Sequence, residues 1–420
     1  MKVRFFASLT LILILVGTAC GGNAPAEPLN SGSLESQSAD EASQIADEQA
    51  QDATPTPFAE PTVAPTVQET LPPPQLSTPV PPTAVPTAEA PAEPTAPPAI
   101  TLVNPEDFGD NRNPLTGEIV DPALLQRRPL AIKVSNSPPL FVRPQSGLNK
   151  ADIVFEHITE GNLTRFTLIV YGDNPSQVGP IRSARLIDAE LPAMYDAGLV
   201  YSGASTGVNS KLFSSDFAGR IIGTGEGGYF RTGEDKPTEH TLYGRPDELR
   251  QVLAGKGENR TPAFGERMNF SSVPPEGGRA ASEITLDFKF ERVSWRYDPE
   301  TNRYYRTAGN VPHNDGLTGE QVSAANIVVP FANHVDDPNV CEEIRNDQCY
   351  LLSVEVQLWG QGDVVVFRDG QRYDGTWRRE NRNDMLTFYD GAGNEIPLQI
   401  GNSWIEVMSI WYDNPLIVAP

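Results

Sequence analysis

Residues 151–171 read ADIVFEHITEGNLTRFTLIVY and decide the fold of the first half of the chain. Two apolar runs, 153–158 and 166–171, flank the tripeptide Gly-Asn-Leu at 161–163. Gly and Asn tolerate the left-handed backbone that a tight turn needs. We therefore expect a β-hairpin in which the second run returns antiparallel to the first.

Glu156 is the one carboxylate inside the first of these runs. It shares a strand face with Val154 and Ile158, because side chains alternate with a period of two. A carboxylate on an apolar face requires a partner. We expect Glu156 to be paired with a cation or to contribute to a binding site.

Strand and helix patterns alternate through residues 112–280, which predicts an α/β or α+β layered domain. The expected strands are 130–134, 153–158, 166–171, 199–202 and 220–223, and the expected helices are 183–196 and 246–253. Residues 281–420 show only strand patterns, which predicts an antiparallel sandwich or a partly closed barrel. Its expected strands are 284–297, 327–331, 350–358, 364–367, 372–377, 386–389, 395–399 and 403–410.

The N-terminus has the pattern of a bacterial lipoprotein signal. Lys2 and Arg4 precede a short apolar run at 9–16, and small residues lead to Cys20. This predicts a signal peptide at 1–19, lipidation of Cys20 and an anchor on the extracytoplasmic face of the cell membrane. The alternative is an ordinary cleaved signal with an incidental cysteine.

Residues 20–111 are rich in Pro, Thr, Ala and Glu and contain no Lys or Arg. Such a composition cannot bury enough apolar surface to offset the ordering entropy. We expect a disordered tether that lifts the folded part off the membrane, or filler without a reach requirement.

Charge and cysteine content exclude several classes of protein. A formal net charge of -23 opposes nucleic-acid binding. Three cysteines are too few for a disulfide-dense scaffold. Outside the cytoplasm, Cys341 and Cys349 are expected to form a disulfide. We expect no metal, since His334 with Asp336 and Asp337 is a weak cluster, and no cofactor.

Residues 203–207 read GASTG and match the nucleophile-elbow pattern of hydrolases after a predicted strand. In that interpretation Ser205 is the nucleophile and His240 the base. A small-residue turn between strand and helix explains the same residues.

Arg182 and Arg185 lie three residues apart at the start of the expected helix 183–196. Cations are disfavoured in a first helical turn, so an anion should compensate them. The anion is either internal, from Asp188, Glu156 or Glu160, or a bound carboxylate, sulfate or phosphate. Arg165 and His240 are expected at the same cleft.

Several stretches together resemble the YerB-type family of bacterial lipoproteins, which has two adjoining domains of unknown function. They are NPLTG at 113–117, RPLAI at 128–132, RPQSG at 143–147, residues 151–156, 164–166 and 179–185, PHND at 312–315, and residues 362–377. The family's Arg-Ser-Ala-Arg and His-x-Leu-Tyr patterns fall on 182–185 and 240–243, which implies a shared pocket. The family implies no catalytic residues, and it has Gly-Gly-Ser where this chain has Gly-Ala-Ser.

Two functions follow from these patterns, beside a third, purely structural role as an assembly partner. The first is a tethered binding module for an anionic or carboxylate-bearing envelope glycan, peptide or protein. The second is an envelope hydrolase that uses Ser205. They differ in one geometric requirement, which is a hydrogen bond from Ser205 to a histidine that a carboxylate orients.

Overall fold

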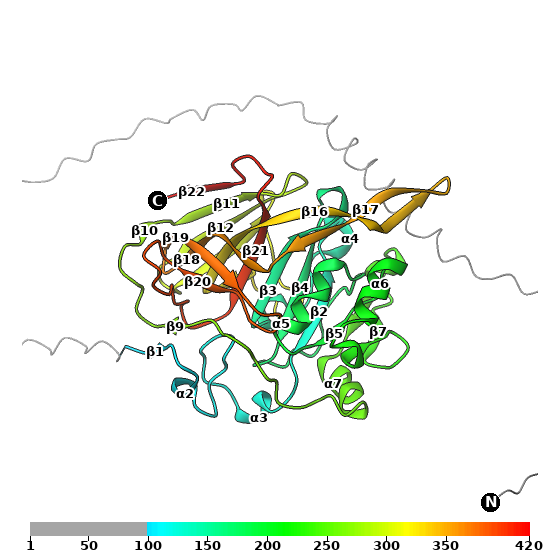
Figure 1. Ribbon diagram of the computed structural model, residues 1–420, viewed down its shortest axis with the longest axis horizontal. Coiled ribbons are helices and arrows are strands. Elements are labelled where there is room, and N and C mark those ends of the chain that lie inside the picture. Colours follow the sequence, from blue (N-terminus) through cyan, green and yellow to red (C-terminus); the bar gives the residue numbers. More distant parts are fainter. Residues whose placement is uncertain (1–98) are drawn as a thin grey trace, which may run out of the picture. The chain divides into compact units, whose positions relative to one another are not determined.

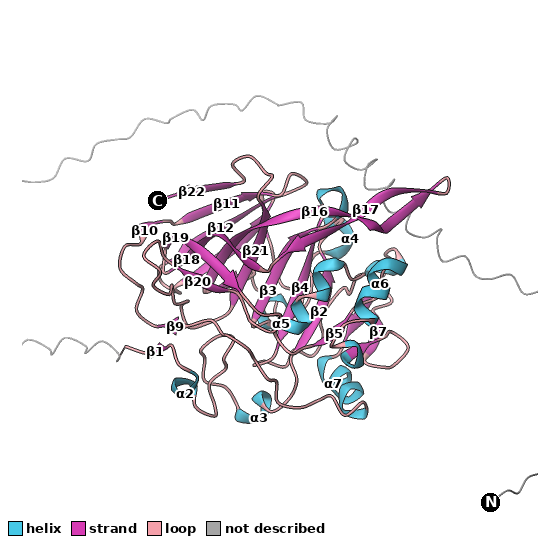
Figure 2. Ribbon diagram, in the orientation of Figure 1, coloured by secondary structure: helices cyan, strands magenta, loops and turns pink. Residues whose placement is uncertain are grey.

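The computed structural model describes residues 99–420, and twelve strands from both halves of the chain form its main sheet (Figures 1 and 2). Ten of them follow in the order β10-β19-β18-β16-β21-β3-β4-β2-β5-β6, while β17 pairs with β16 and β20 with β19. The strands are β2 (Leu130–Ser135), β3 (Ile153–Ile158), β4 (Thr164–Val170), β5 (Gly198–Val200), β6 (Ile221–Ile222), β10 (Arg279–Ala280), β16 (Asn326–Arg345), β17 (Gln348–Gln357), β18 (Gly360–Arg368), β19 (Gln371–Arg379), β20 (Thr387–Tyr389) and β21 (Ser403–Ser409).

The two halves meet where β21 lies between β3 and β16. Both pairings are parallel, with Glu406 opposite Glu156 and Val328 opposite Ile405. The predicted hairpin of β3 and β4 is confirmed, and Asn162 in its turn has a φ of 59°. Backbone hydrogen bonds therefore run without interruption from the mixed sheet of the first half into the mainly antiparallel strands of the second.

A second sheet of six strands covers one face of the main sheet. It consists of β11 (Glu283–Asp287), β12 (Arg292–Asp298), β13 (Arg303–Ala308), β14 (Val311–Pro312), β15 (Ser323–Ala324) and β22 (Leu416–Ala419). Trp295 from this sheet and Trp404 from β21 are both buried, with ring centroids 5.1 Å apart. The second half is therefore the sandwich, not the barrel, of the two predicted arrangements.

Helices lie on both faces of the first half, as a layered α/β domain requires. The α-helices are α2 (Pro105–Phe108), α3 (Pro122–Leu125), α4 (Pro139–Val142), α5 (Leu191–Met194), α6 (Thr206–Phe213) and α7 (Pro246–Gly255). The 3-10 turns are η1 (Leu148–Lys150), η2 (Glu160–Asn162), η3 (Leu186–Ala189), η4 (Ala218–Arg220) and η5 (Thr238–His240). The remaining strand pairs are β1 (Thr101–Leu102) with β9 (Phe270–Ser271), and β7 (Tyr229–Arg231) with β8 (Leu242–Gly244).

The expected continuous helix over 183–196 is wrong. The structure has η3 followed by α5, and Pro192 stands in the first turn of α5. Residues 180–184 are instead extended, because Arg182 N donates to the Lys133 carbonyl and Ile181 bridges to Val134. The expected helix 246–253 is confirmed as α7, with Pro246 in its first turn.

The strand patterns of the second half are mostly confirmed. The hairpin of β18 and β19 turns through Asp369 and Gly370, which have φ values of 51° and 67°. The expected single strand over 284–297 is two strands, β11 and β12, with the turn between them. Lys289 in this turn has a φ of 70°, which ends the first strand.

Strands β16 and β17 form a long hairpin that projects beyond the main sheet toward α6 (Figure 1). Cys341 and Cys349 are joined near its tip, with Cα atoms 5.7 Å apart, which confirms the predicted disulfide. On the inner side of the hairpin, Val340 lies against Gly207 of α6. A covalent link therefore holds together the end of an element that contacts the first half.

The folded part begins before residue 112, where the expected tether ends. Leu102 in β1 and Phe108 in α2 are buried, and the Phe108 ring meets Phe270 edge to face at 6.4 Å. These two apolar side chains tie the segment to the fold. The predicted signal peptide, Cys20 and the tether up to residue 98 lie outside the described residues.

Glu156 pairs with Arg306 of the second sheet. Their side chains are fully buried, and Arg306 Nη2 donates to Glu156 Oε2 at 2.6 Å. Asn136 and Thr164 also donate to this carboxylate. Burial and the adjacent Glu156 charge raise the pKa of Glu406 well above its usual range. The network therefore places two carboxyl groups and one guanidinium together between the two sheets.

Replacement of Arg306 tests this network. We expect Arg306→Met to lower the free energy of unfolding by about 3–5 kcal/mol, because Glu156 loses its buried counter-charge. Urea unfolding followed by tryptophan fluorescence measures the change. Arg292→Met on the exposed side of β12 is the control, since it removes only a surface ion pair with Asp287 and should cost less than about 1 kcal/mol. Equal losses in the two variants would contradict the prediction.

Candidate functional site

Three arginines of the first half converge under the β16–β17 hairpin. We call Arg165, Arg182 and Arg185, with Glu160 and Glu342, the arginine cluster. Arg165 is in β4, and Glu342 comes from β16, while the extended segment 180–184 supplies Arg182. Both halves of the chain thus contribute to one charged site.

Backbone hydrogen bonds fix the extended segment that carries Arg182 and leads to Arg185. Arg182 N donates to the Lys133 carbonyl at 3.0 Å on one side, and Ser202 N donates to the Arg182 carbonyl at 3.1 Å on the other. Ala184 N donates to the Gly203 carbonyl at 2.9 Å. The segment acts as a short strand between β2 and the loop before α6, which sets the position of both guanidinium groups.

Arg185 is paired with carboxylates from both halves of the chain. Its Nε atom lies 2.6 Å from Glu160 Oε2 and 3.5 Å from Glu342 Oε2. Its backbone N donates to Asp188 Oδ2 at 2.7 Å, which starts η3. The expected internal anion is therefore Glu160, joined by Glu342, which the sequence patterns did not indicate.

Arg165 lies close to the positive charges of Arg182 and Arg185 and to the negative charges of Glu160 and Glu342. Its Nη1 donates to the Ser183 carbonyl at 2.6 Å. Burial lowers the pKa of Arg165 well below its usual range, and the charges of Arg185 and Arg182 lower it further. Glu160 and Glu342 oppose this shift in the pKa of Arg165 but contribute less than the two arginines do. The cluster therefore holds three guanidinium groups and two carboxylates in one partly buried place.

Ser205 does not have the geometry of a hydrolase nucleophile. Its hydroxyl donates to Glu342 Oε1 at 3.0 Å and accepts from Val208 N, so that it caps α6. Among the hydrogen bonds of residues 99–420, none joins Ser205 to a histidine. The GASTG motif is a helix-capping turn, and the geometric requirement for the hydrolase interpretation is not met.

His240 approaches the cluster from η5 and is buried. Its ring stacks on Phe141 with centroids 5.7 Å apart, and Nδ1 has no hydrogen-bond partner. Burial, followed by the charge of Arg182, lowers the pKa of His240 to about 4. The charges of Arg182 and Arg165 both lower the pKa of His240, and the predicted shared cleft of these residues stays a prediction.

A second charged group lies below the arginine cluster, between β2, β3, β4 and η3. Lys133, whose side chain is fully buried, donates to Asp188 at 3.0 Å and to Thr167 at 3.0 Å, and its Nζ lies 2.6 Å from His157 Nε2. Burial lowers the pKa of Lys133 to about 8, against the attraction of Asp188. These residues add a fixed ammonium group beneath the guanidinium groups. The sequence could have indicated this group, because Lys133 and His157 are polar residues within otherwise apolar strands.

Glu156 does not join this site. It lies on the opposite face of β3, with Arg306, so the expected pairing with Arg182 or Arg185 is not found. The two-residue period placed it correctly with Val154 and Ile158. The sequence patterns did not indicate that Arg306 of the second sheet lies on that face and pairs with Glu156.

No group of three potential metal ligands occurs within residues 99–420. His334 and Asp336 are on β16, and the His334 Nδ1 atom lies 3.0 Å from the Ala332 carbonyl. Across the same residues, no helix is long and apolar enough to cross a membrane.

Comparison with known proteins identifies relatives for both halves. Residues 115–259 match the family described as "Protein of unknown function (DUF3048) N-terminal domain", and residues 284–405 match its C-terminal domain. The chain is 28% identical over 308 residues to "Putative lipoprotein YerB" of Bacillus subtilis (strain 168), covering 70% of this chain and 85% of that protein. The crystal structure of the YerB protein from Bacillus subtilis superposes with a TM-score of 0.59 at 25% identity, covering 74% and 99% of the two chains.

The lowered pKa of His240 predicts a pH dependence of stability. A histidine whose folded pKa is about 4 binds fewer protons than the unfolded chain between pH 4 and its unfolded value of about 6.5. Stability should therefore fall as the pH falls through this window, by up to about 3 kcal/mol for this residue. We expect His240→Gln to lose less stability than the wild type between pH 7 and 4.5, measured by urea unfolding. A parallel decline in both proteins would contradict this assignment.

Proposed function

The chain belongs to the DUF3048 family, and on that premise we propose that it is a membrane-anchored extracytoplasmic protein that binds an anionic or carboxylate-bearing ligand of the cell envelope. The arginine cluster is the proposed site. The observation that carries the proposal is the gathering of Arg165, Arg182 and Arg185 under the β16–β17 hairpin, where the charges of Arg185 and Arg182 both lower the pKa of Arg165. A ligand carboxylate or phosphate would relieve this repulsion, and guanidinium groups bind such anions in a bidentate manner.

The arrangement of the site supports binding more than catalysis. Arg185 is held by two carboxylates, and its backbone is fixed by Asp188. A guanidinium that is already oriented loses little freedom when it meets an anion. Glu342 and Ser205 connect the hairpin to α6 beside it. Movement of this hairpin would change access to the cluster.

The anchor is the second part of the proposal. The relative from Bacillus subtilis carries lipoprotein in its name, and the sequence around Cys20 has a signal-like pattern. Diacylation of Cys20 would hold the protein stably, whereas one chain would not. The ligand would then be a component of the envelope near the membrane.

Anion-dependent melting tests the site. We expect sulfate or a muramyl peptide to raise the melting temperature of the wild-type folded part, and Arg165→Gln to remove most of this increase. The reason is that Arg165 carries the unrelieved charge, so its loss removes the benefit of a bound anion. Arg296→Gln on exposed β12 is the matched control and should retain the full increase. A wild type that gains no stability from either anion would contradict the proposal.

Cell fractionation tests the anchor. We expect Cys20→Ser to move the full-length protein from the membrane fraction to the soluble or secreted fraction, because the acylated thiol is lost. Ala19→Gly, which retains a small residue before the cysteine, is the control and should stay with the membrane. Retention of Cys20→Ser in the membrane fraction would show that another segment holds the protein there.

A further inference from the structure

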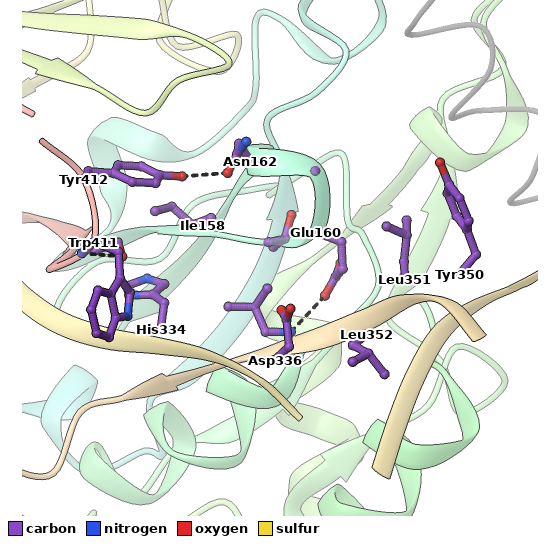
Figure 3. A pocket seen from close by; sticks show the side chains of 14 residues that line it. Ile158, Glu160, Asn162, His334, Asp336, Tyr350, Leu351, Leu352, Trp411 and Tyr412 are labelled. Carbon is purple, nitrogen blue, oxygen red and sulfur yellow. Dashed lines mark hydrogen bonds between the residues drawn. The ribbon is translucent and has the colours of Figure 1, made fainter. Parts of the chain in front are cut away.

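A cavity of about 440 Å³ has Glu160 of the arginine cluster in its lining (Figure 3). It lies between the turn 158–162, the β16–β17 hairpin and the segment 409–412. We call it the aromatic groove, because Tyr350, Trp411 and Tyr412 line it. Figure 3 shows Trp411 and Tyr350 at opposite ends, with Asp336 and Glu160 between them. The groove is therefore long enough to have separate aromatic ends and a polar middle.

Trp411 is a large aromatic side chain that the fold leaves exposed and yet holds in place. It is 67% exposed, and its indole Nε1 donates to Asn333 Oδ1 at 2.9 Å. The neighbouring Tyr412 hydroxyl donates to Asn162 Oδ1 at 2.8 Å, which fixes the other wall of this end. An oriented, exposed aromatic ring offers contact area at little cost in side-chain entropy.

The polar groups of the groove suit an uncharged ligand rich in hydroxyl groups. His334 Nε2 is buried and has no hydrogen-bond partner, and burial lowers the pKa of His334 to about 4, so the ring is neutral. Asp336 on the same strand is exposed. The residues that line the groove include no lysine or arginine. The groove therefore presents hydrogen-bonding groups and aromatic surface without the cations that bind acidic ligands.

A peptide that adds a strand to β17 is disfavoured by one hydrogen bond. Strand addition needs free backbone N–H groups at a sheet edge. Val354 of β17 lines the groove, and its N–H donates to Glu160 Oε1 at 3.4 Å. Glu160 itself is held by Arg185 at 2.6 Å. The edge is therefore blocked at this position by a side chain that is fixed in place.

We propose that the aromatic groove binds carbohydrate, with a sugar ring stacked on Trp411 and hydroxyl or acetamido groups bonded to the exposed carboxylate of Asp336. Pyranose rings have one apolar face of C–H bonds and a rim of hydroxyl groups, which matches a ring platform beside polar acceptors. This inference does not require an anion at the arginine cluster. If the cluster binds one, a glycan with acidic substituents would occupy both sites across Glu160, an extension that rests on the proposed function.

Calorimetric titration with an uncharged N-acetylglucosamine hexasaccharide tests the groove. We expect the wild-type folded part to bind it, and Trp411→Ala to bind about tenfold more weakly, because the stacking surface is lost. Trp359→Ala is the matched control, since this tryptophan is also exposed, at 46%, but does not line the groove. The control should bind like the wild type, and melting temperatures will show that both variants fold.

The other outcomes overturn the proposal. No heat of binding with the wild type, or equal affinity in Trp411→Ala, would exclude a carbohydrate site on Trp411. A lysine-rich peptide that binds in a Trp411-dependent manner, while the hexasaccharide does not, would assign the groove to cationic peptides instead. Arg165→Gln should bind the neutral hexasaccharide like the wild type, so failure at the arginine cluster and failure at the groove are distinguishable.

Discussion

The structure depends on the parallel insertion of β21 between β3 and β16. This strand comes from the end of the chain, yet it supplies the hydrogen bonds that join the first half to the second. Because the pairing is parallel, it needs long connections, and its closure is costly in chain entropy. Once β21 is in place, Glu406 lies opposite Glu156, and the second sheet brings Arg306 over both. The charged network is a consequence of this register, and a shift of one residue would remove these groups from that face.

The same insertion creates the candidate site. Strand β16, paired with β21 along its first part, continues as the hairpin with β17 and carries Glu342 to the arginines of the first half. The segment 409–412 follows β21 directly and forms one end of the aromatic groove. The arginine cluster and the groove therefore meet at Glu160, whose two oxygens bond to Arg185 and to Val354 N. The carboxylate of Glu160 therefore lies between the three arginines and a groove whose lining has no lysine or arginine.

Local patterns predicted the local structure well. Apolar runs located β2, β3 and β4 to within two residues, and Asp369-Gly370 identified the hairpin of β18 and β19. The patterns failed where a distant segment competed for the backbone. The apolar spacing after Arg185 is helical, but β2 and the Gly203 carbonyl hold residues 180–184 extended, and η3 starts only at Leu186. Local sequence patterns also could not predict that one sheet joins both halves, because the pairing of β21 with β3 connects residues about 250 apart in sequence.

The sequence indicated the arginines of the candidate site, but it did not indicate Glu342, one of the two carboxylates that pair with Arg185. The motif spacing singled out Arg165, Arg182, Arg185 and His240, and the structure shows that Arg182 and Arg185 influence Arg165 and that Arg182 and Arg165 influence His240. Glu342 comes from a hairpin of the other half, so no spacing could indicate it. Two carboxylates hold Arg185, which fixes the site, but they leave the repulsion at Arg165 only partly offset. This incomplete compensation of charge is the physical basis on which we propose that the site accepts a further anion.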